Sequence, residues 1–302
     1  MCVRHCCRPG HFYTINMNTH PIKNILVPVD FGENALNALE TAIAIAKLHG
    51  ATLHLLHVVD NSFDFLNHGD TYISMSSITE NSGDILQALA GSLAQKHKLM
   101  PKVLLMEGCV YQTIVKESIV HNADLIVLGT HGASGQRDSF VGTNTYNVFK
   151  HAHCAVLAVP GNRKWSQFRN VLFPVRLVTG ALARYDFVRS LLSPGTASLE
   201  VLGLFYNRSE NEKSVMEDLV SEIQDKLNED KVRANSTCLS GRNIVDNILM
   251  HSEQKSADLI VISPSVDVAS KHFFVGPNAQ RIIHRARVPV LNVKRVAVPA
   301  FG

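Results

Sequence analysis

Long apolar runs are absent from this 302-residue sequence. Its apolar runs span about five to eight residues, whereas a helix that crosses a membrane needs roughly 20. The first 20 residues also lack the continuous apolar core of a signal peptide. We therefore expect a cytoplasmic protein without a membrane partner.

An excess of one charge sign is absent as well. The sequence has 29 lysine and arginine residues against 26 aspartate and glutamate residues, and the basic residues are scattered. Binding to a nucleic-acid backbone requires a clustered basic face. We therefore expect no nucleic-acid partner. The hydrophobic share of 46% is enough for ordinary globular cores.

Cysteine provides no recognisable metal pattern. Half of the six cysteines lie in the first seven residues, close to two histidines. Their spacing matches no zinc motif, and no second pair of ligands accompanies them. We predict no metal site and expect residues 1–22 to be a disordered, cloning-derived or start-site extension.

An internal duplication organises the rest of the chain. ADLIV occurs unchanged at residues 123–127 and 257–261, and NILVPVD at residues 24–30 returns as NVLFPVR at 170–176. Later matches join residues 141–144 with 275–278 and residues 155–159 with 289–293. Matches at the start, middle and end of each half make chance similarity an inadequate explanation, and each half has the size of one compact domain.

We therefore predict two domains with one fold. The first spans residues 23–160 and the second 170–296, and residues 161–169 form a linker. Apolar strand patterns alternate with helical patterns in both halves, which favours right-handed βαβ units and a parallel sheet covered on both faces. The predicted class is α/β: two tandem doubly wound domains, each with a five-stranded parallel sheet flanked by helices.

The expected elements follow the same order in each half. The strands are residues 25–29, 52–58, 102–106, 125–128 and 155–159, then 171–175, 199–205, 233–238, 259–262 and 290–293. The helices are residues 34–48, 84–97, 110–121 and 144–150, then 180–192, 214–228, 244–254 and 278–285. Residues 60–83 are polar and serine-rich and are expected to form a long loop running into the next helix.

A glycine pattern closes the first half. GTHG at residues 129–132 follows a buried strand, and GT at residues 142–143 precedes a helical segment. Glycine lets backbone amides approach an anion and adopt positive φ, while a helix N-terminus adds unpaired N–H groups and partial positive charge. This order predicts a phosphate site. Asp30 and Val58 also end strands, so they share an edge of the sheet with Gly129.

These motifs together resemble a known family. PVD at residues 28–30, LLHV at 55–58, ADLIVLG at 123–129 and the pattern G-x2-G-x9-G-T are similar to the universal stress protein family, here as a tandem two-domain member. The resemblance covers nearly all of residues 23–295. It implies a five-stranded parallel fold and ATP as the ligand, with Mg²⁺ left open. It also implies that the last strands of the two halves pair in an internal pseudo-dimer, and a homodimer of whole chains stays open.

The resemblance also implies a set of binding residues. The backbone of Val58 contacts the adenine edge, and Pro28, Val29 and Asp30 line the adenosine. The residues assigned to the ribose and phosphates are Gly129, His131, Gly132, Gly142, Thr143 and Asn144. Thr143 is the strongest single candidate, because it offers both a hydroxyl and a helix-terminal N–H.

Several of these residues also have a purely structural interpretation. Asp30 is equally suited to capping the helix that follows, and Gly142 to a helix-entry turn. His131 is either a phosphate donor or a solvent-facing loop residue. His57 is expected to pack beside the sheet without a site role. No acid or nucleophile accompanies His131 in sequence, so we predict no catalytic residue.

The second half departs from the family pattern at every phosphate position but one. The replacements are Ser263 for Gly129, Val266 for Gly132, Pro277 for Thr143 and Arg176 for Asp30. A β-branched residue disfavours positive φ, and proline at a helix start removes an N–H. We expect the fold to be retained without nucleotide binding, with Arg176 and Lys271 suited to some other anion.

Three functions follow as hypotheses. The leading one is an ATP-binding regulatory stress-response protein, in which nucleotide in the first domain alters shape or the choice of an unnamed protein partner. The second is a slow ATPase or nucleotidyl-transfer enzyme, for which His131 and Asp138 are the nearby candidate groups. The third is a scaffold that works without nucleotide.

Overall fold

The structure is a computed structural model of all 302 residues. It describes residues 22–60, 75–130, 142–161, 164–176, 181–192, 195–205, 210–241, 243–262, 265–266, 273–274 and 276–293. The expected amino-terminal extension lies almost entirely outside these described residues.

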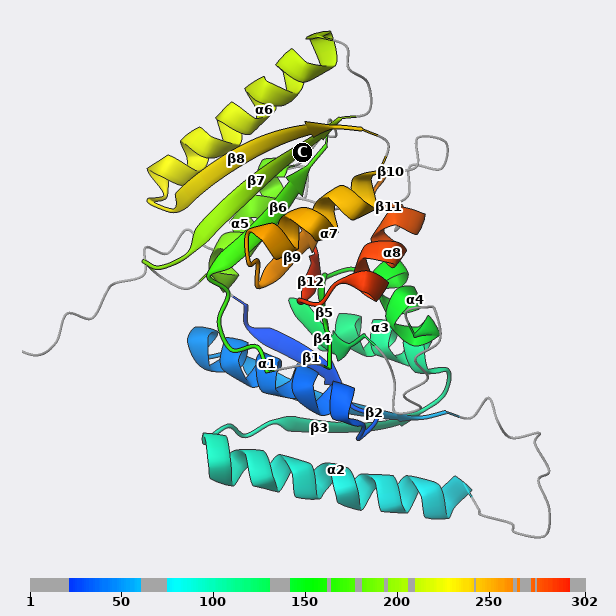
Figure 1. Ribbon diagram of the computed structural model, residues 1–302. Helices are drawn as coiled ribbons and strands as arrows, with labels where there is room; N and C mark the ends of the chain where they lie inside the picture. The colour runs from blue at the N-terminus through cyan, green and yellow to red at the C-terminus, as the bar shows by residue number, and fades with distance from the viewer. Residues whose placement is uncertain are drawn as a thin grey trace, which may run out of the picture.

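Nine elements form the first half of the chain (Figure 1). They are β1 (Asn24–Pro28), α1 (Glu33–His49), β2 (Thr52–Val59), α2 (Met75–His97), β3 (Lys102–Glu107), α3 (Val110–Val120), β4 (Leu125–Gly129), α4 (Thr143–His151) and β5 (Ala155–Val159).

The second half repeats this order and adds a short hairpin. Its elements are β6 (Asn170–Val175), α5 (Ala181–Leu191), β7 (Ser198–Phe205), α6 (Glu210–Glu229), β8 (Arg233–Ser240), α7 (Ile244–Gln254), β9 (Leu259–Ile262), β10 (Ser265–Val266), β11 (Phe273–Phe274), α8 (Pro277–Arg285) and β12 (Val290–Asn292). The hairpin of β10 and β11 is antiparallel and was not predicted from the sequence.

One continuous ten-stranded sheet contains both halves, in the order β3-β2-β1-β4-β5-β12-β9-β6-β7-β8. Pairing within each half is parallel, as predicted for two doubly wound domains. The halves join where β5 runs antiparallel to β12, with Leu157 opposite Leu291. The expected pairing of the two terminal strands is therefore present, and it removes both of these edges from solvent.

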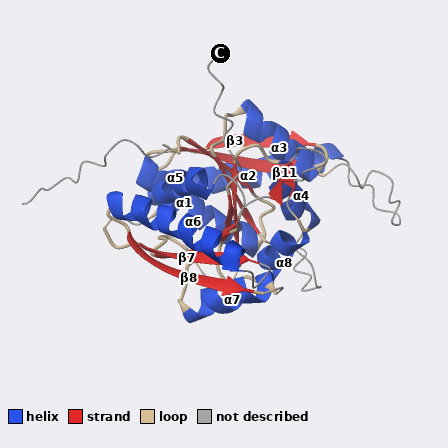
Figure 2. Ribbon diagram, turned by 90° about the horizontal axis from the view of Figure 1, so that it is seen from above, coloured by secondary structure: helices blue, strands red, loops and turns tan. Residues whose placement is uncertain are grey.

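Helices cover the two faces of the sheet in matching sets (Figures 1 and 2). One face packs against α1, α2, α5 and α6, and the other against α3, α4, α7 and α8. Central strands are buried on both sides, because Ile25 and Val27 enter the first layer while Leu26 enters the second. This burial on both faces explains why the central strands are continuous apolar runs in the sequence.

The segment between the halves is packed into the molecule. Trp165 is 4% exposed and Phe168 is 2% exposed, and both belong to the core layer beneath α1 and α5. Phe168 also forms a β-bridge with Leu192. A linker with buried aromatic side chains holds the two halves against one another.

The start of α2 differs from the sequence expectation. The helix begins at Met75, inside the segment expected to be a loop. Its core contacts begin at Leu86, and Glu80 and Asn81 are exposed. The early turns therefore have no apolar period that sequence reasoning could detect.

A buried ion cluster lies between β7, β8 and α7. One oxygen of Glu200 accepts a hydrogen bond from the Thr237 hydroxyl at 2.9 Å and lies 3.0 Å from Nε2 of His251. The other oxygen lies 3.3 Å from Nζ of Lys255. Burial alone would raise the pKa of Glu200, but hydrogen bonds from His251, Thr237 and Lys255 outweigh it and lower the pKa.

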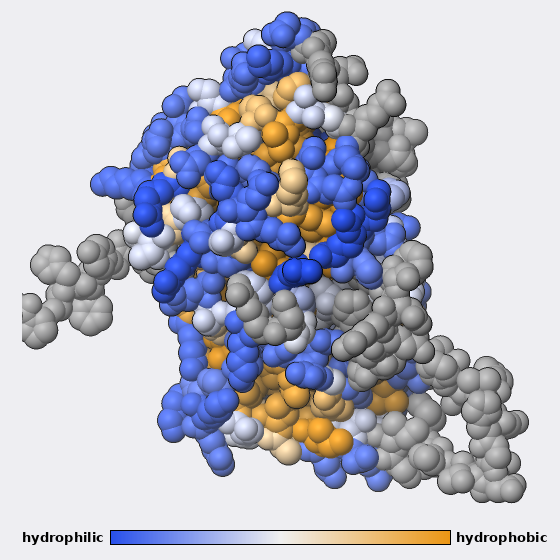
Figure 3. Space-filling view, viewed as in Figure 1, coloured by the Kyte–Doolittle hydropathy of each residue, from blue (hydrophilic) through white to orange (hydrophobic). Residues whose placement is uncertain are grey.

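The surface seen in the view of Figure 1 is largely hydrophilic, with apolar residues showing between the helices (Figure 3). Within the described ranges, no helix is both long enough and apolar enough to cross a membrane.

Candidate functional site

The first half contains a cavity of about 350 Å³ at the carboxyl ends of its central strands. This volume lies in the range of about 300–1,000 Å³ that is usual for small-molecule sites. The cavity is lined by Pro28, Val29, Asp30, Ala35, Leu56, His57, Val58, Val110, Ile114, Leu128, Gly129, Gly142, Thr143, Asn144 and Thr145. It lies where β1 and β4 are neighbours and their following helices leave to opposite faces, which is the usual ligand position in open α/β sheets.

Eight of the ten sequence-predicted site residues line this one cavity. They are Pro28, Val29, Asp30, Val58, Gly129, Gly142, Thr143 and Asn144. The other two, His131 and Gly132, lie outside the described residues, as does Asp138. Sequence reasoning brought together residues from β1, β2, β4 and α4 that are more than 100 positions apart along the chain.

Asp30 does not cap α1 as one interpretation of the sequence expected, because the N-cap is Gly32 and the helix start has no side-chain cap hydrogen bond. Its Oδ1 accepts a hydrogen bond from the backbone N–H of Gly32 at 3.0 Å, and Gly32 is the residue that caps the start of α1. The side chain is nevertheless exposed and lines the cavity. Asp30 thus shapes the turn between β1 and α1 while presenting a carboxylate to the cavity.

His57 lines the cavity, although the sequence assigned it no site role. Its Nδ1–H donates a hydrogen bond to the carbonyl of Val29 at 2.7 Å. Its ring also stacks on Phe31, with ring centroids 4.5 Å apart, and Phe31 has a φ of 62°. The imidazole therefore holds the strained β1–α1 turn in place, as the expected packing role implied.

Gly129 is required by close packing. A Cβ atom at this position would lie 3.0 Å from the backbone carbon and oxygen of Asn34, so a side chain would require the start of α1 to shift. Neither Gly129 nor Gly142 has a positive φ, which corrects the conformational reason given from the sequence. The buried Thr145 hydroxyl donates a hydrogen bond to the Gly129 carbonyl at 2.9 Å and ties α4 to β4.

The N-terminus of α4 points its first turn at the cavity. Gly142 caps the helix with φ −50° and ψ 133°, and no side chain caps it. Thr143 and Asn144 are exposed, and the first N–H groups of a helix have no partner within the helix. These N–H groups and the helix dipole favour an anionic ligand group at this end of the cavity.

The described lining combines apolar side chains with the carboxylate of Asp30 and the imidazole of His57. Val110, Ile114 and Leu128 provide an apolar wall, and Asp30 is the one carboxylate among the described lining residues. In the described part of the chain, no group of three or more His, Cys, Asp or Glu side chains is placed to hold a metal ion. The cavity therefore fits a ligand with an apolar ring, hydroxyl groups and an anionic end.

The second half has a smaller cavity, of about 220 Å³, at the equivalent position. Arg176 and Pro277 line it, in the places of Asp30 and Thr143. Val266 lies in the strand β10, whereas Ser263 and Lys271 lie outside the described residues.

Known proteins are similar to this chain at both levels, sequence and fold. The family model for the universal stress protein family matches residues 21–160. A universal stress protein of Methanocaldococcus jannaschii is 31% identical over 143 residues, which is 47% of this chain and 84% of that protein. One of Thermus aquaticus is 29% identical over 137 residues, or 45% of this chain and 98% of that protein.

A solved universal stress protein of Archaeoglobus fulgidus covers 90% of this chain and 96% of its own, with a TM-score of 0.69 and 20% identity. A solved putative universal stress protein of Pseudomonas aeruginosa covers 90% and 93%, with a TM-score of 0.62 and 17% identity. At these identities the two structures show the fold, and they extend the similarity across both halves. The chain belongs to the universal stress protein family, with two domains of this fold in tandem.

Proposed function

We propose that this protein is an ATP-binding regulatory stress-response protein whose nucleotide is held by the first domain only. The observation that supports this most directly is the convergence of an apolar wall, a carboxylate and a helix N-terminus on one cavity of about 350 Å³. A nucleotide has matching parts: a flat base, a ribose with hydroxyl groups and a phosphate chain. A solved universal stress protein is a complex with cAMP.

In this proposal the adenine lies against Ile114 and the backbone of Val58, and Asp30 accepts hydrogen bonds from the ribose hydroxyls. The phosphates lie at the first turn of α4, where Thr143 adds a hydroxyl to the helix N–H groups. The described lining offers no carboxylate cluster for a metal. Any Mg²⁺ would therefore enter as the counter-ion of ATP, held by its phosphates and water.

The second domain has lost the groups that this binding mode uses. Pro277 begins α8 and has no N–H to donate to a phosphate. Arg176 stands where Asp30 would accept hydrogen bonds from a ribose, and a guanidinium only donates. One ATP for each chain is the expected stoichiometry.

The position of α4 suggests how nucleotide binding in the first domain affects the second domain. This helix runs directly into β5, the strand that joins the two halves. In addition, Nδ2 of the buried Asn292 in β12 donates a hydrogen bond to the Phe149 carbonyl in α4 at 3.4 Å. A nucleotide bound at the first turn of α4 therefore acts on a helix that already contacts the other half. This contact favours a regulatory role in which nucleotide binding alters the arrangement of the two halves.

The slow-ATPase alternative needs a base or metal ligand near the phosphates. The candidates named from the sequence for that role, His131 and Asp138, lie outside the described residues. Analysis of the nucleotide that co-purifies with the protein separates the hypotheses. Recovered ATP supports storage of the intact nucleotide, accumulating ADP supports hydrolysis, and absence of any nucleotide binding supports the scaffold.

Calorimetric titration of the full chain with ATP tests the proposal. The Gly142→Val variant is expected to lose binding, because its side chain would crowd the phosphates while its φ of −50° suits a β-branched residue. Gly276→Val is the matched control, because Gly276 has the same capping position at α8. It should keep about one ATP for each chain. Unchanged affinity in a folded Gly142→Val variant would overturn the assignment of the phosphate end.

A further inference from the structure

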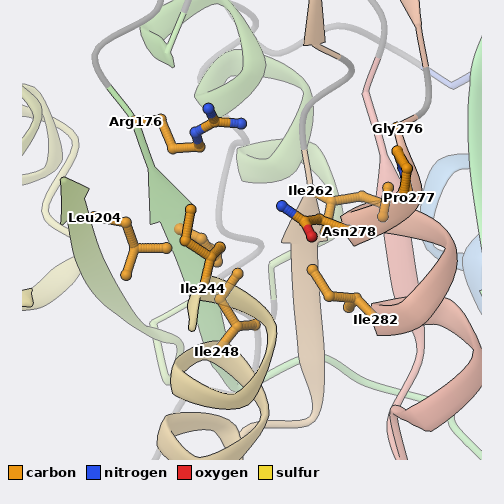
Figure 4. Close-up of a pocket in the computed structure, with 11 residues that line it drawn as sticks. Arg176, Leu204, Ile244, Ile248, Ile262, Gly276, Pro277, Asn278 and Ile282 are labelled. Atoms are coloured by element: carbon orange, nitrogen blue, oxygen red, sulfur yellow. The ribbon is translucent and has the colours of Figure 1, made fainter. Parts of the chain in front are cut away.

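The second domain keeps a cavity at the carboxyl ends of β6, β7 and β9, although the nucleotide-binding pattern is gone (Figure 4). It is lined by Pro174, Arg176, Leu204, Ile244, Ile248, Ile262, Gly276, Pro277, Asn278, Ala279 and Ile282. The topology of the sheet opens a crevice at this position in both halves, so the residues that line it decide which ligand fits.

Two polar groups face the upper part of this cavity. Figure 4 shows the Arg176 guanidinium and the Asn278 amide pointing toward the space between them, from the end of β6 and the first turn of α8. A guanidinium binds planar carboxylates through two parallel hydrogen bonds, and an amide N–H is a further donor. Two side chains that donate hydrogen bonds toward one space suit a planar anion.

The lower part of the cavity is apolar. Ile244, Ile248 and Ile282 lie beneath the polar pair in Figure 4, and each is at most 5% exposed. The first domain has Val110 where the second has Ile244, so the second cavity has the bulkier aliphatic floor. Binding of hydrocarbon on this floor of isoleucine side chains is favourable, because it removes apolar surface from water.

The same features disfavour a polyphosphate. Pro277 removes one N–H from the start of α8, and Gly276 has an extended backbone with φ −73°. The volume of about 220 Å³ is below the range of about 300–1,000 Å³ that is usual for sites of drug-sized ligands. The described lining therefore favours a compact ligand with one anionic group and a hydrocarbon body over a polyphosphate.

We propose that the second domain binds a compact monocarboxylate with an apolar body, its carboxylate held by Arg176 and Asn278 and its hydrocarbon lying on the isoleucine floor. This site is separate from the nucleotide cavity of the first domain. The chain would then report on two different ligands through one continuous sheet.

Titration of the full chain with hexanoate, followed by calorimetry, tests this site. Hexanoate should bind once for each chain, whereas hexanol lacks the charge and acetate lacks the hydrocarbon, so both should bind at least about tenfold more weakly. Arg176→Gln should weaken hexanoate binding by about tenfold or more. Arg281→Gln removes an exposed cation of α8 that lies outside the cavity lining, and it should leave binding unchanged.

Ile248→Phe provides a second test, because it fills the floor without altering charge. It should also weaken hexanoate binding, so the proposal stays falsifiable if Arg176→Gln proves unfolded by circular dichroism. Failure of hexanoate to bind, or equal binding by folded wild type, Arg176→Gln and Ile248→Phe proteins, would overturn the proposal. So would ATP or inorganic phosphate binding that Arg176→Gln abolishes and Gly142→Val leaves intact.

Discussion

Stability should fall in mildly acidic solution because of one buried histidine in β2. His54 is 1% exposed, and its Nε2 lies 3.2 Å from Oδ1 of Asn24. Its Nδ1 has no hydrogen-bond partner among the described residues. Burial, together with repulsion from the nearby His121 and Lys102, lowers the pKa of His54 to about 4.

The sign and size of the effect follow from the two pKa values. Below pH 6.5 the unfolded chain binds a proton at this histidine, while the folded chain resists protonation until about pH 4. The folded state therefore loses stability steadily over this interval as the pH falls. At 1.36 kcal/mol for each pKa unit, the loss is about 3 kcal/mol between pH 7 and pH 4.

Urea unfolding at a series of pH values measures this loss. The comparison is between the wild-type protein and His54→Gln, which keeps an amide able to bond to Asn24 and cannot titrate. Other groups change in both proteins, so the difference between them isolates His54. We expect the wild type to lose about 3 kcal/mol more than the variant between pH 7 and pH 4. Parallel pH profiles for the two proteins would refute the assignment.

Three further predictions concern packing, charge and the junction of the halves. Gly129→Ala should lower the free energy of unfolding in urea by about 1–3 kcal/mol, because its Cβ would press on the backbone of α1. The control Gly91→Ala, in an open part of the interior of α2, should raise this free energy by about 0.5–1 kcal/mol. Glu200→Gln should lower the free energy of unfolding by about 1–3 kcal/mol at pH 7, because it removes the buried carboxylate that accepts from Thr237 and pairs with Lys255. This loss should shrink as the pH falls through the lowered pKa of Glu200, and a constant loss would contradict the ionic role. Leu157→Arg should separate β5 from β12 and give concentration-dependent association by size-exclusion chromatography, and an unchanged monomer peak and melting temperature would argue against this junction.

The fold was predictable from the sequence wherever an element is buried on a regular period. The strands of residues 155–159 and 259–262 have the predicted bounds, because each is an apolar run that is fully buried. The prediction was wrong at residues 75–83, which belong to α2 but are mostly polar, with Glu80 and Asn81 exposed. A single continuous sheet could be expected only from the family resemblance, because antiparallel pairing between distant strands leaves no local pattern.

The candidate site was predictable where motifs mark the ends of strands and the start of a helix. Those motifs identify the backbone that lines the cavity, but they do not show which neighbouring side chains complete it. Thr145 and the place of His57 in the cavity lining were missed, because they depend on contacts with Gly129 and Val29 across strands and between elements. Gly129 also shows that a correct residue can have a different physical reason, since α1 lies against it. Binding of ATP by these residues stays a prediction.

The two cavities illustrate that the topology of the sheet creates a crevice, whereas the residues that line the crevice determine which ligand it suits. In each half, two neighbouring strands send their following helices to opposite faces of the sheet, so a crevice opens between them whatever the sequence. A cavity in the second domain is therefore no argument for nucleotide binding there. The change from Asp30 to Arg176 reverses the charge at the end of the first strand, and the change from Thr143 to Pro277 removes a hydroxyl and a backbone N–H from the start of the helix. Both changes leave the sheet and its core unaffected, so ligand preference can diverge between tandem domains without loss of the fold.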